Sequence, residues 1–315
     1  MTAARHITLL DGGTGRELLR IGAPFAQPEW SAKALLEGPE FVTRVHENFV
    51  AAGAEVITTN SYAVVPFHLG TERFEREGHR LAALAGQLAR AVAAKAPRAI
   101  EVAGGLPPLC GSYRADLYDP VVARPILTTL LDALGPHVDL WLAETLSSST
   151  EAELVREMIG AIDRHEAKPF WLSFTLADAA PGEAPPALRS GEPVADAVAT
   201  AVRLGASAVL FNCSRPEVMG AAVSIAAQQL GRAGEAGSPS GAGRAMRIGV
   251  YANAFVPLDT MTEANAELSE LRVDVTPAAY LAFARDWVHR GATIIGGCCG
   301  IGPEHIANLR NLNAA

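Results

Sequence analysis

Residues 194–213 read VADAVATAVRLGASAVLFNC, and this stretch contains one complete structural unit. Its first half places apolar residues at helical spacing on one face: Val194, Ala197, Val198, Ala201 and Val202. Gly205 is a residue type that commonly ends a helix, and the unbroken apolar run Ala208–Phe211 follows it. Such a run is typical of a strand whose two faces are both buried in a parallel sheet. The stretch therefore predicts helix, turn and strand, and it ends on the pair Asn212 and Cys213.

This alternation of strand and helix repeats along the whole chain. We predict eight strands, most of them nearly continuous apolar runs: Ile7–Leu10, Glu55–Thr59, Ile100–Ala103, Val138–Leu142, Phe170–Phe174, Ala208–Phe211, Arg247–Tyr251 and Thr293–Gly296. Eight such units predict an α/β fold, a single (β/α)8 TIM barrel over residues 1–315. The rival fold is a doubly wound open sheet. It requires a G-x-G-x-x-G turn after the first strand, and residues 11–15 (DGGTG) lack that spacing.

One stretch interrupts the alternation. Residues 231–243 are rich in Gly, Ser and Ala, a composition that favours a flexible loop over a packed element. We therefore expect a flexible insertion just before the seventh strand, on the side of the barrel away from the active site.

Composition and charge narrow the classes of partner. Hydrophobic residues make up 49% of the 315 residues, which excludes a disordered chain. There are 34 acidic and 26 basic residues, so the net charge is −8, and no Lys/Arg cluster offsets it. This balance argues against a nucleic-acid partner and favours small-molecule substrates, cationic ones in particular.

The apolar runs and the cysteines bear on the compartment. No apolar run reaches the roughly 18 residues of a membrane span, and Ile7–Leu10 is too short for the core of a signal peptide. Four cysteines do not make a disulfide framework in a chain of this length. We therefore expect a cytoplasmic protein with reduced thiols, in which clustered cysteines indicate a metal site or catalysis.

Polar and reactive residues follow the predicted strands at their carboxyl ends: Asp11, Asn60 to Tyr62, Glu144, Thr175, Asn212 with Cys213, Asn253, and Cys298 with Cys299. In a barrel all of these ends meet on one face, where active sites are built. Loops are polar in any protein, but that does not explain three cysteines, since Cys is usually buried. The sequence therefore predicts an active site at this face.

Cys213, Cys298 and Cys299 follow the sixth and eighth strands, which are near neighbours on the barrel rim. Thiolates from both ends could reach one ion. Zinc takes tetrahedral sulfur ligands, and a catalytic site keeps its fourth position open, which three cysteines would leave. Adjacent cysteines are not the usual C-x-x-C spacing, so a vicinal disulfide or inert buried thiols stay open as alternatives.

Two other features carry chemistry on the same face. Asp11 and Glu144 are suited to general acid–base work or to recognition of a cation such as an α-amino group. Each also has a structural interpretation, Asp11 as a turn residue and Glu144 as a first-turn acid of a helix. Residues 296–303 (GGCCGIGP) could instead cradle a phosphate with backbone N–H groups, a use that needs the glycines but not the cysteines.

The motifs resemble those of the homocysteine S-methyltransferase family, the zinc-dependent thiol methylases, nearly from end to end. The resemblance rests on LLDGGTG at 9–15, AGAEVITTNSY at 52–62, AET at 143–145, FNC at 211–213, YANA at 251–254 and GGCCG at 296–300. It implies a zinc ion on Cys213, Cys298 and Cys299 of a (β/α)8 barrel, and a homocysteine amino group held by Asp11 and Glu144. It also suggests Asn253 as a labile fourth ligand, and Gly12, Tyr62 and Asn212 as pocket residues.

The family divides by methyl donor. Its members with cobalamin and folate modules, and its betaine-using members, are longer than this chain. That leaves a sulfonium donor, S-methylmethionine or S-adenosylmethionine, with methionine as the product. The chain departs from the family pattern in the loop Gly104–Arg114, which contains Cys110, and at Phe255.

We favour S-methylmethionine, because the adenosyl group of the alternative requires a wider pocket. Two rival functions stay open: a barrel enzyme on a phosphorylated substrate that uses the strand-eight glycine loop, and a non-catalytic sensor of zinc or homocysteine. The sequence leaves the oligomeric state open.

Overall fold

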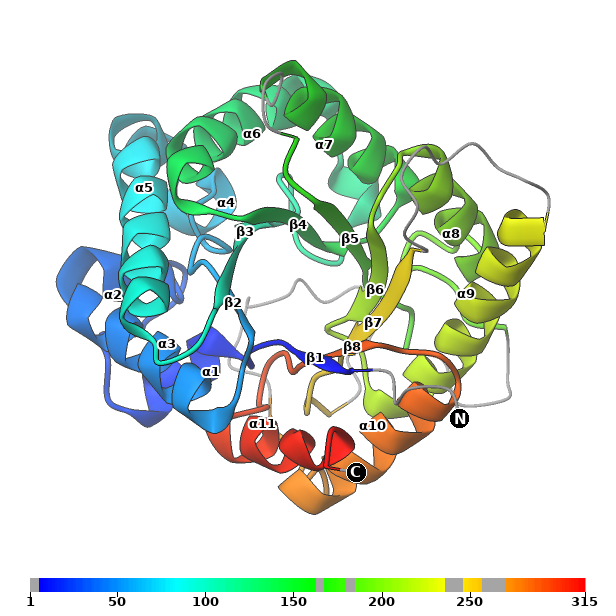
Figure 1. The fold of residues 1–315 in the computed structure, drawn as a ribbon. Coiled ribbons are helices and arrows are strands. Elements are labelled where there is room, and N and C mark those ends of the chain that lie inside the picture. Colours follow the sequence, from blue (N-terminus) through cyan, green and yellow to red (C-terminus); the bar gives the residue numbers. More distant parts are fainter. Residues whose placement is uncertain (1–5, 163–166, 179–184, 236–245, 257–269, 315) are drawn as a thin grey trace.

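The structure, a computed structural model, describes residues 6–162, 167–178, 185–235, 246–256 and 270–314. The chain forms eight strands. The strands make a ring inside a ring of helices (Figure 1). They are β1 (Thr8–Leu9), β2 (Val56–Thr58), β3 (Glu101–Leu106), β4 (Leu140–Leu146), β5 (Phe170–Phe174), β6 (Ala208–Asn212), β7 (Arg247–Tyr251) and β8 (Ile294–Ile295). Each overlaps one of the eight strands predicted from the sequence.

All strand pairs are parallel, and the strand order is β1-β8-β7-β6-β5-β4-β3-β2. A single parallel bridge between Leu10 and Val56 joins the two ends of this order. Backbone hydrogen bonds support the bridge, from Glu55 N–H to the Leu9 carbonyl (2.7 Å) and from Asp11 N–H to the Val56 carbonyl (3.0 Å). The sheet therefore closes on itself, which confirms the predicted TIM barrel.

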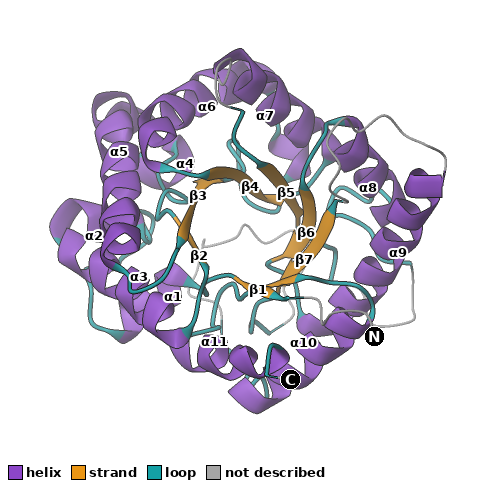
Figure 2. Cartoon of the chain, in the orientation of Figure 1, coloured by secondary structure: helices purple, strands orange, loops and turns teal. Residues whose placement is uncertain are grey.

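The helices pack around the outside of the sheet (Figure 2). The described α-helices are α1 (Thr14–Arg20), α2 (Ala32–Glu37), α3 (Pro39–Ala52), α4 (Pro66–Leu69), α5 (Thr71–Lys95), α6 (Pro120–Leu134), α7 (Ser149–Ile162), α8 (Val194–Arg203), α9 (Pro216–Glu235), α10 (Pro277–His289) and α11 (Pro303–Leu309). Short 3-10 turns follow at η1 (Ala115–Leu117), η2 (Gly135–His137) and η3 (Arg310–Leu312). Several helices begin with proline, whose fixed φ suits the first helical position.

The strands are apolar on both sides because each side faces a core. The barrel interior is filled by alternate strand residues: Leu10, Val56, Ala103, Leu140, Leu142, Trp171, Ala208, Leu210, Tyr251 and Ile294. The residues between them, such as Trp141 and Val209, pack outward against the helices. This period of two explains why the strands read as continuous apolar runs in the sequence.

Two strands run three or more residues further than the sequence predicts, and β6 runs one residue further, to Asn212. β3 continues to Leu106 and β4 to Leu146, where a register shift lets Leu146 pair with Phe174. Glu144 and Thr145 therefore belong to a strand and not to the loop after it, because the ladder with β5 continues past the polar residues. The interpretation of Glu144 as a first-turn helix acid is wrong, since α7 begins only at Ser149.

The stretch 231–243 is divided between a helix and residues outside the described ranges. Helix α9 continues to Glu235, so residues 231–235 are helical and not part of a flexible loop. Residues 236–243 lie outside the described residues. Within the described part of the chain, no helix is long and apolar enough to cross a membrane.

Candidate active site

A cavity opens at the carboxyl ends of the strands. Its walls come from the segments that follow β1, β2, β3, β6 and β8 and from the ends of β4 and β7. Seven of the residues proposed from the sequence as zinc ligands or substrate contacts line it: Asp11, Gly12, Tyr62, Glu144, Cys213, Cys298 and Cys299. No Lys, Arg or His is among the described residues that line it. The cavity is thus rich in groups that can carry negative charge and lacks a protein cation.

The three thiols converge at one wall of this cavity. Their Sγ atoms all lie within 4.8 Å of one another, at 2.8 Å for Cys298 to Cys213 and 4.0 Å for Cys298 to Cys299. A tetrahedral zinc ion with ligands at 2.3 Å would need sulfur–sulfur edges of about 3.8 Å. The 4.0 Å edge already matches, and an ion would spread the shorter one by about 1 Å. The donor set and its geometry therefore fit a metal ion with one open position.

The environment of Cys213 favours its thiolate. Hydrogen bonds from Cys298 and Cys299 hold the pKa of the buried Cys213 thiol well below its usual range, and a hydrogen bond from Tyr113 acts in the same direction. The Tyr113 hydroxyl lies 3.0 Å from Cys213 Sγ. A thiolate is the form of cysteine that binds metals.

Two carboxyl groups lie in the same cavity. Asp11 Oδ2 accepts a hydrogen bond from Thr58 N–H (2.7 Å) and Oδ1 accepts one from the Thr58 hydroxyl (3.3 Å). Burial raises the pKa of Asp11 to about 7, although these hydrogen bonds oppose the shift. Burial, Asp11 and Cys213 together raise the pKa of Glu144 to about 8. A bound cation would lower both pKa values, so the pair is suited to hold one.

Left-handed backbone is concentrated at the cavity. Among the described residues, four non-glycine residues have a positive φ, namely Trp30 (48°), Tyr113 (65°), Thr145 (60°) and Cys213 (52°), and all four line the cavity. This conformation is costly for residues with a Cβ, above all for a β-branched one such as Thr145. Strain of this kind persists where the surroundings enforce it, and it is typical of functional sites.

Asn212 and Asn253 do not line the cavity. Asn212 Oδ1 accepts hydrogen bonds from Thr145 N–H (3.0 Å) and the Ser173 hydroxyl (2.8 Å), and its Nδ2 donates to Thr145 Oγ1 (2.8 Å). Asn212 therefore does not line the cavity as expected, and its contact with substrate stays a prediction. It instead holds Thr145 in its strained conformation.

Asn253 Oδ1 accepts a hydrogen bond from Phe255 N–H at 3.3 Å, within its own turn after β7. Asn253 is buried, and its backbone N–H donates to the carbonyl oxygen of Ser214, the residue after Cys213, at 3.0 Å. Ligation by Asn253 would require this oxygen to leave the turn, so its role as a labile ligand stays a prediction. Cys110 is half-buried, and its thiol donates to the Asp119 carbonyl at 3.6 Å and not to the thiol cluster.

Sequence reasoning missed several residues of the cavity wall. Trp30, Thr58, Tyr113 and Tyr251 all line it. Thr58 and Tyr251 end the strands β2 and β7, so their position at strand ends could have indicated them. Trp30 and Tyr113 lie in loops without a regular pattern, and no sequence signal places them here. Tyr62 lines the cavity as expected, and its hydroxyl is hydrogen-bonded to Ser112 (2.6 Å).

The sequence profile of the homocysteine S-methyltransferase family matches residues 8–312. The chain belongs to this family. It is 31% identical to the homocysteine S-methyltransferase of Escherichia coli (strain K12), across 97% of this chain and 95% of that protein. It is 26% identical to the selenocysteine Se-methyltransferase of Brassica oleracea var. italica, across 95% and 86% of the two chains. Membership in this family makes the chain a methyltransferase.

The fold agrees with a solved structure of the family. The metallated form of the homocysteine methyltransferase MmuM from Escherichia coli matches with a TM-score of 0.73 at 28% identity, over 98% of this chain and 96% of that one. The resemblance to the homocysteine S-methyltransferase family and the TIM barrel predicted from the sequence are both confirmed.

In this homocysteine S-methyltransferase fold the strand-eight loop serves the packing of the site. A Cβ on Gly12 would lie 2.2 Å from the Ile301 carbonyl oxygen, and one on Gly13 would lie 2.5 Å from the Cys298 carbonyl oxygen. Several N–H groups of the loop bond to backbone carbonyls, from Gly297 to Asp11 (2.9 Å) and from Cys298 to Ala252 (2.8 Å). These two N–H groups are not free to bind a phosphate, which weighs against the phosphate alternative.

Proposed function

We propose that the chain transfers a methyl group from a sulfonium donor, S-methylmethionine or S-adenosylmethionine, to the thiol of homocysteine, and so forms methionine. One observation carries the proposal: three convergent thiols and two carboxyl groups share one cavity whose described lining holds no cationic side chain. A substrate that carries both a thiol and an α-amino group can place its thiol at the three cysteines and its amino group at the two carboxyl groups. The family membership supports homocysteine as the acceptor.

Cys213, Cys298 and Cys299 would hold a zinc ion. Soft sulfur donors in a set of three fit zinc with one position left for a substrate thiol. The ion would supply deprotonation of that thiol, whose pKa in water is about 8.5, so that a thiolate is present at neutral pH. The metallated form known for MmuM supports a metal in this fold.

Asp11 and Glu144 would bind the α-ammonium group of homocysteine. Both lie in the cavity, and only Asp11 has hydrogen-bond donors from the described residues, both from Thr58. Glu144 therefore has both carboxylate oxygens available for an ammonium group, which carries three donors. A charge-assisted bond of this kind orients the amino acid so that its sulfur points toward the cysteines.

The methyl transfer itself requires positioning more than acid–base help. The thiolate sulfur forms a bond to the methyl carbon while the donor's carbon–sulfur bond breaks, and the donor leaves as a neutral thioether. Trp30 and Tyr62 line the cavity, and their aromatic rings would attract a sulfonium cation and exclude water. No group on the donor side has to be protonated, which is why a sulfonium fits a single domain without a further cofactor.

We place the reaction in the cytoplasm, because all four cysteines are free in the structure and the proposed site needs reduced thiols. The substrates are small molecules, and the partners include no nucleic acid.

A donor and acceptor screen tests the function. Zinc-loaded protein is incubated with homocysteine and with S-methylmethionine, S-adenosylmethionine or betaine in turn, and methionine is measured. We expect turnover with a sulfonium, S-methylmethionine first. Selenocysteine replaces homocysteine in a parallel series, because two of the relatives are named as selenocysteine methyltransferases. Turnover with betaine but with neither sulfonium would contradict the proposed sulfonium donor. Homocysteine binding without any turnover would favour the alternative function, a non-catalytic sensor.

A further inference from the structure

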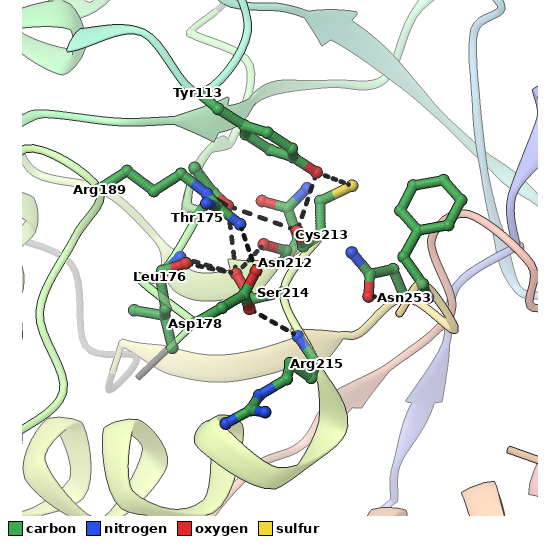
Figure 3. Close-up of polar contacts among 11 residues, drawn as sticks. Tyr113, Thr175, Leu176, Asp178, Arg189, Asn212, Cys213, Ser214, Arg215 and Asn253 are labelled. Carbon is green, nitrogen blue, oxygen red and sulfur yellow. Dashed lines mark hydrogen bonds and ion pairs between the residues drawn. The ribbon is translucent and has the colours of Figure 1, made fainter. Parts of the chain in front are cut away.

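Tyr113 touches the proposed metal site although it belongs to a different loop. It lies between β3 and η1, in the loop where the chain departs from the family pattern, and the residue is 4% exposed. Its hydroxyl oxygen lies 3.0 Å from Cys213 Sγ and 2.9 Å from the Cys213 carbonyl oxygen, so its one O–H proton is shared between these two acceptors. Figure 3 shows the ring extending toward the sulfur from the opposite side to Asn253. The hydroxyl is therefore positioned on one metal ligand and on the backbone that carries it.

The ring of Tyr113 is itself held in place. The Arg189 guanidinium lies 4.0 Å from the ring centroid and forms an ion pair with Asp178 at 2.9 Å. The side chains of Arg189 and Asp178 are only 4% and 7% exposed. Arg189 Nε also donates to Thr175 Oγ1 at 3.3 Å. A desolvated ion pair stacked on an aromatic face restricts the ring far more than a surface contact would.

The hydrogen bond from the Tyr113 hydroxyl distinguishes the Cys213 thiol from the neighbouring thiol of Cys298. Within the described part of the chain, the hydrogen bonds at Cys298 Sγ involve only the thiols of Cys213 and Cys299. Cys213 alone of this pair accepts a bond from a phenol. A thiolate that accepts a hydrogen bond shares its lone pair with the donor, so it is a weaker electron donor and a weaker nucleophile.

This difference matters if the proposed function holds, since a methyl donor would then face the substrate sulfur and three protein sulfurs on one ion. Methylation of Cys213 would break the donor's carbon–sulfur bond, release the thioether and leave an uncharged S-methylcysteine that no longer binds the metal well. We infer that Tyr113 is a positioning residue that fixes the Cys213 ligand and, through its hydrogen bond to Sγ, protects that sulfur from alkylation, so that the methyl group goes to the substrate.

The test replaces Tyr113 by phenylalanine, which removes one oxygen and keeps the ring. Tyr118→Phe is the matched control, since Tyr118 lies on the same loop, is half-buried and has no hydrogen bond to Cys213. Each protein is loaded with cobalt(II), and its thiolate-to-cobalt charge-transfer band is recorded. Zinc-loaded samples are treated with iodomethane, and peptide mass spectrometry measures the methylation rate of Cys213.

In Tyr113→Phe we expect the charge-transfer band to move to lower energy and Cys213 to be methylated about tenfold faster, the effect of removing one hydrogen bond to a charged group. Tyr118→Phe should match the wild type in both measurements. An unchanged band and rate in Tyr113→Phe would overturn the inference. So would failure of that variant to take up metal, because the hydroxyl would then be required for metal binding itself and not only for the orientation and reactivity of Cys213. If the wild type takes up no metal, the proposed metal site fails first, and that result is distinct from the other two.

Discussion

At the scale of single residues, the three clustered cysteines give the most direct test of the site, because replacing any one of them should reduce zinc binding. Cys213→Ala, Cys298→Ala and Cys299→Ala should each weaken zinc binding by more than about 100-fold, since each removes one of only three protein ligands. Cys110→Ala should keep its zinc, because this thiol bonds to the Asp119 carbonyl outside the cluster. Metal content after gel filtration, measured by mass spectrometry of the elements, checks both statements. Full zinc occupancy in all three cluster variants would show that the ligands are wrong.

Glu144 and Asp11 allow a second test at single residues. Glu144→Gln keeps the shape of the side chain but removes its charge, and we expect homocysteine binding to weaken about 10- to 100-fold while zinc stays bound. Asp11→Asn should act in the same direction.

The matched ligand for this test is 4-mercaptobutanoate, which keeps the thiol and the carboxylate of homocysteine and lacks the amino group. It should bind the wild type poorly, and Glu144→Gln should weaken it little further. Equal calorimetric affinity of the wild type for both ligands would contradict the role given to the two carboxyl groups.

At the scale of elements, the contact between the β1 and β8 loops depends on glycine. A Cβ on Gly13 would lie 2.5 Å from the Cys298 carbonyl oxygen, so the segment that carries two metal ligands would have to move. We expect Gly13→Ala to lower the denaturant midpoint and the zinc affinity together. Gly160→Ala in helix α7 is the control, since its Cβ meets nothing within 4 Å. That change should stabilise the protein by up to about 1 kcal/mol, because alanine is the better helix former. A Gly13→Ala protein with wild-type stability and metal affinity would refute the close approach.

The start of helix α7 makes stability depend on pH. Buried Glu151 accepts hydrogen bonds from Ser147 N–H (3.0 Å) and Ser148 N–H (3.1 Å), and burial raises its pKa from 4.5 to about 7. The native state therefore keeps this proton at pH values where the unfolded chain has lost it. The stability that this proton contributes is complete below about pH 4.5 and is lost as the pH rises through about 7.

In the variant Glu151→Gln the new side chain cannot ionise, but it can still accept the hydrogen bonds from the N–H groups of Ser147 and Ser148. Relative to the wild type, its free energy of unfolding should rise by roughly 1–3 kcal/mol between pH 5 and pH 8. Urea midpoints at the two pH values measure this difference. A difference between Glu151→Gln and the wild type that is the same at both pH values would contradict the raised pKa.

At the scale of the whole molecule, the proposed ion joins parts of the barrel that are distant in sequence. Cys213 follows β6 and the adjacent pair follows β8, with β7 between them. An ion that binds only the folded chain raises the free energy of unfolding by about 2.7 kcal/mol when its concentration is 100 times its dissociation constant. Zinc should therefore raise the melting temperature of the wild type by roughly 5 °C or more, and chelator should reverse the change. Cys213→Ala should show no zinc-dependent shift, and a shift of the same size in that variant would place the stabilising ion elsewhere.

The sequence alone determined the alternation of strands and helices. The helical spacing of apolar residues and the apolar runs of the strands both depend on residues that are close together in the chain. Each predicted strand recurs in the barrel, and Asp11, Cys213 and Cys298 lie at the strand ends where they were expected. Parallel strands bring their carboxyl ends to one face of the barrel. The order of strands and helices was therefore enough to predict that these residues lie together.

Only the tertiary structure decided which atoms meet. Asn212 and Cys213 are neighbours, yet one bonds inside the barrel to Thr145 and Ser173 and the other turns into the cavity through its left-handed backbone. The contact of the Tyr113 hydroxyl with Cys213 joins residues 100 positions apart. The direction of a side chain at a strand end, and the loop that reaches it, are set by packing between distant segments. No local pattern encodes that packing.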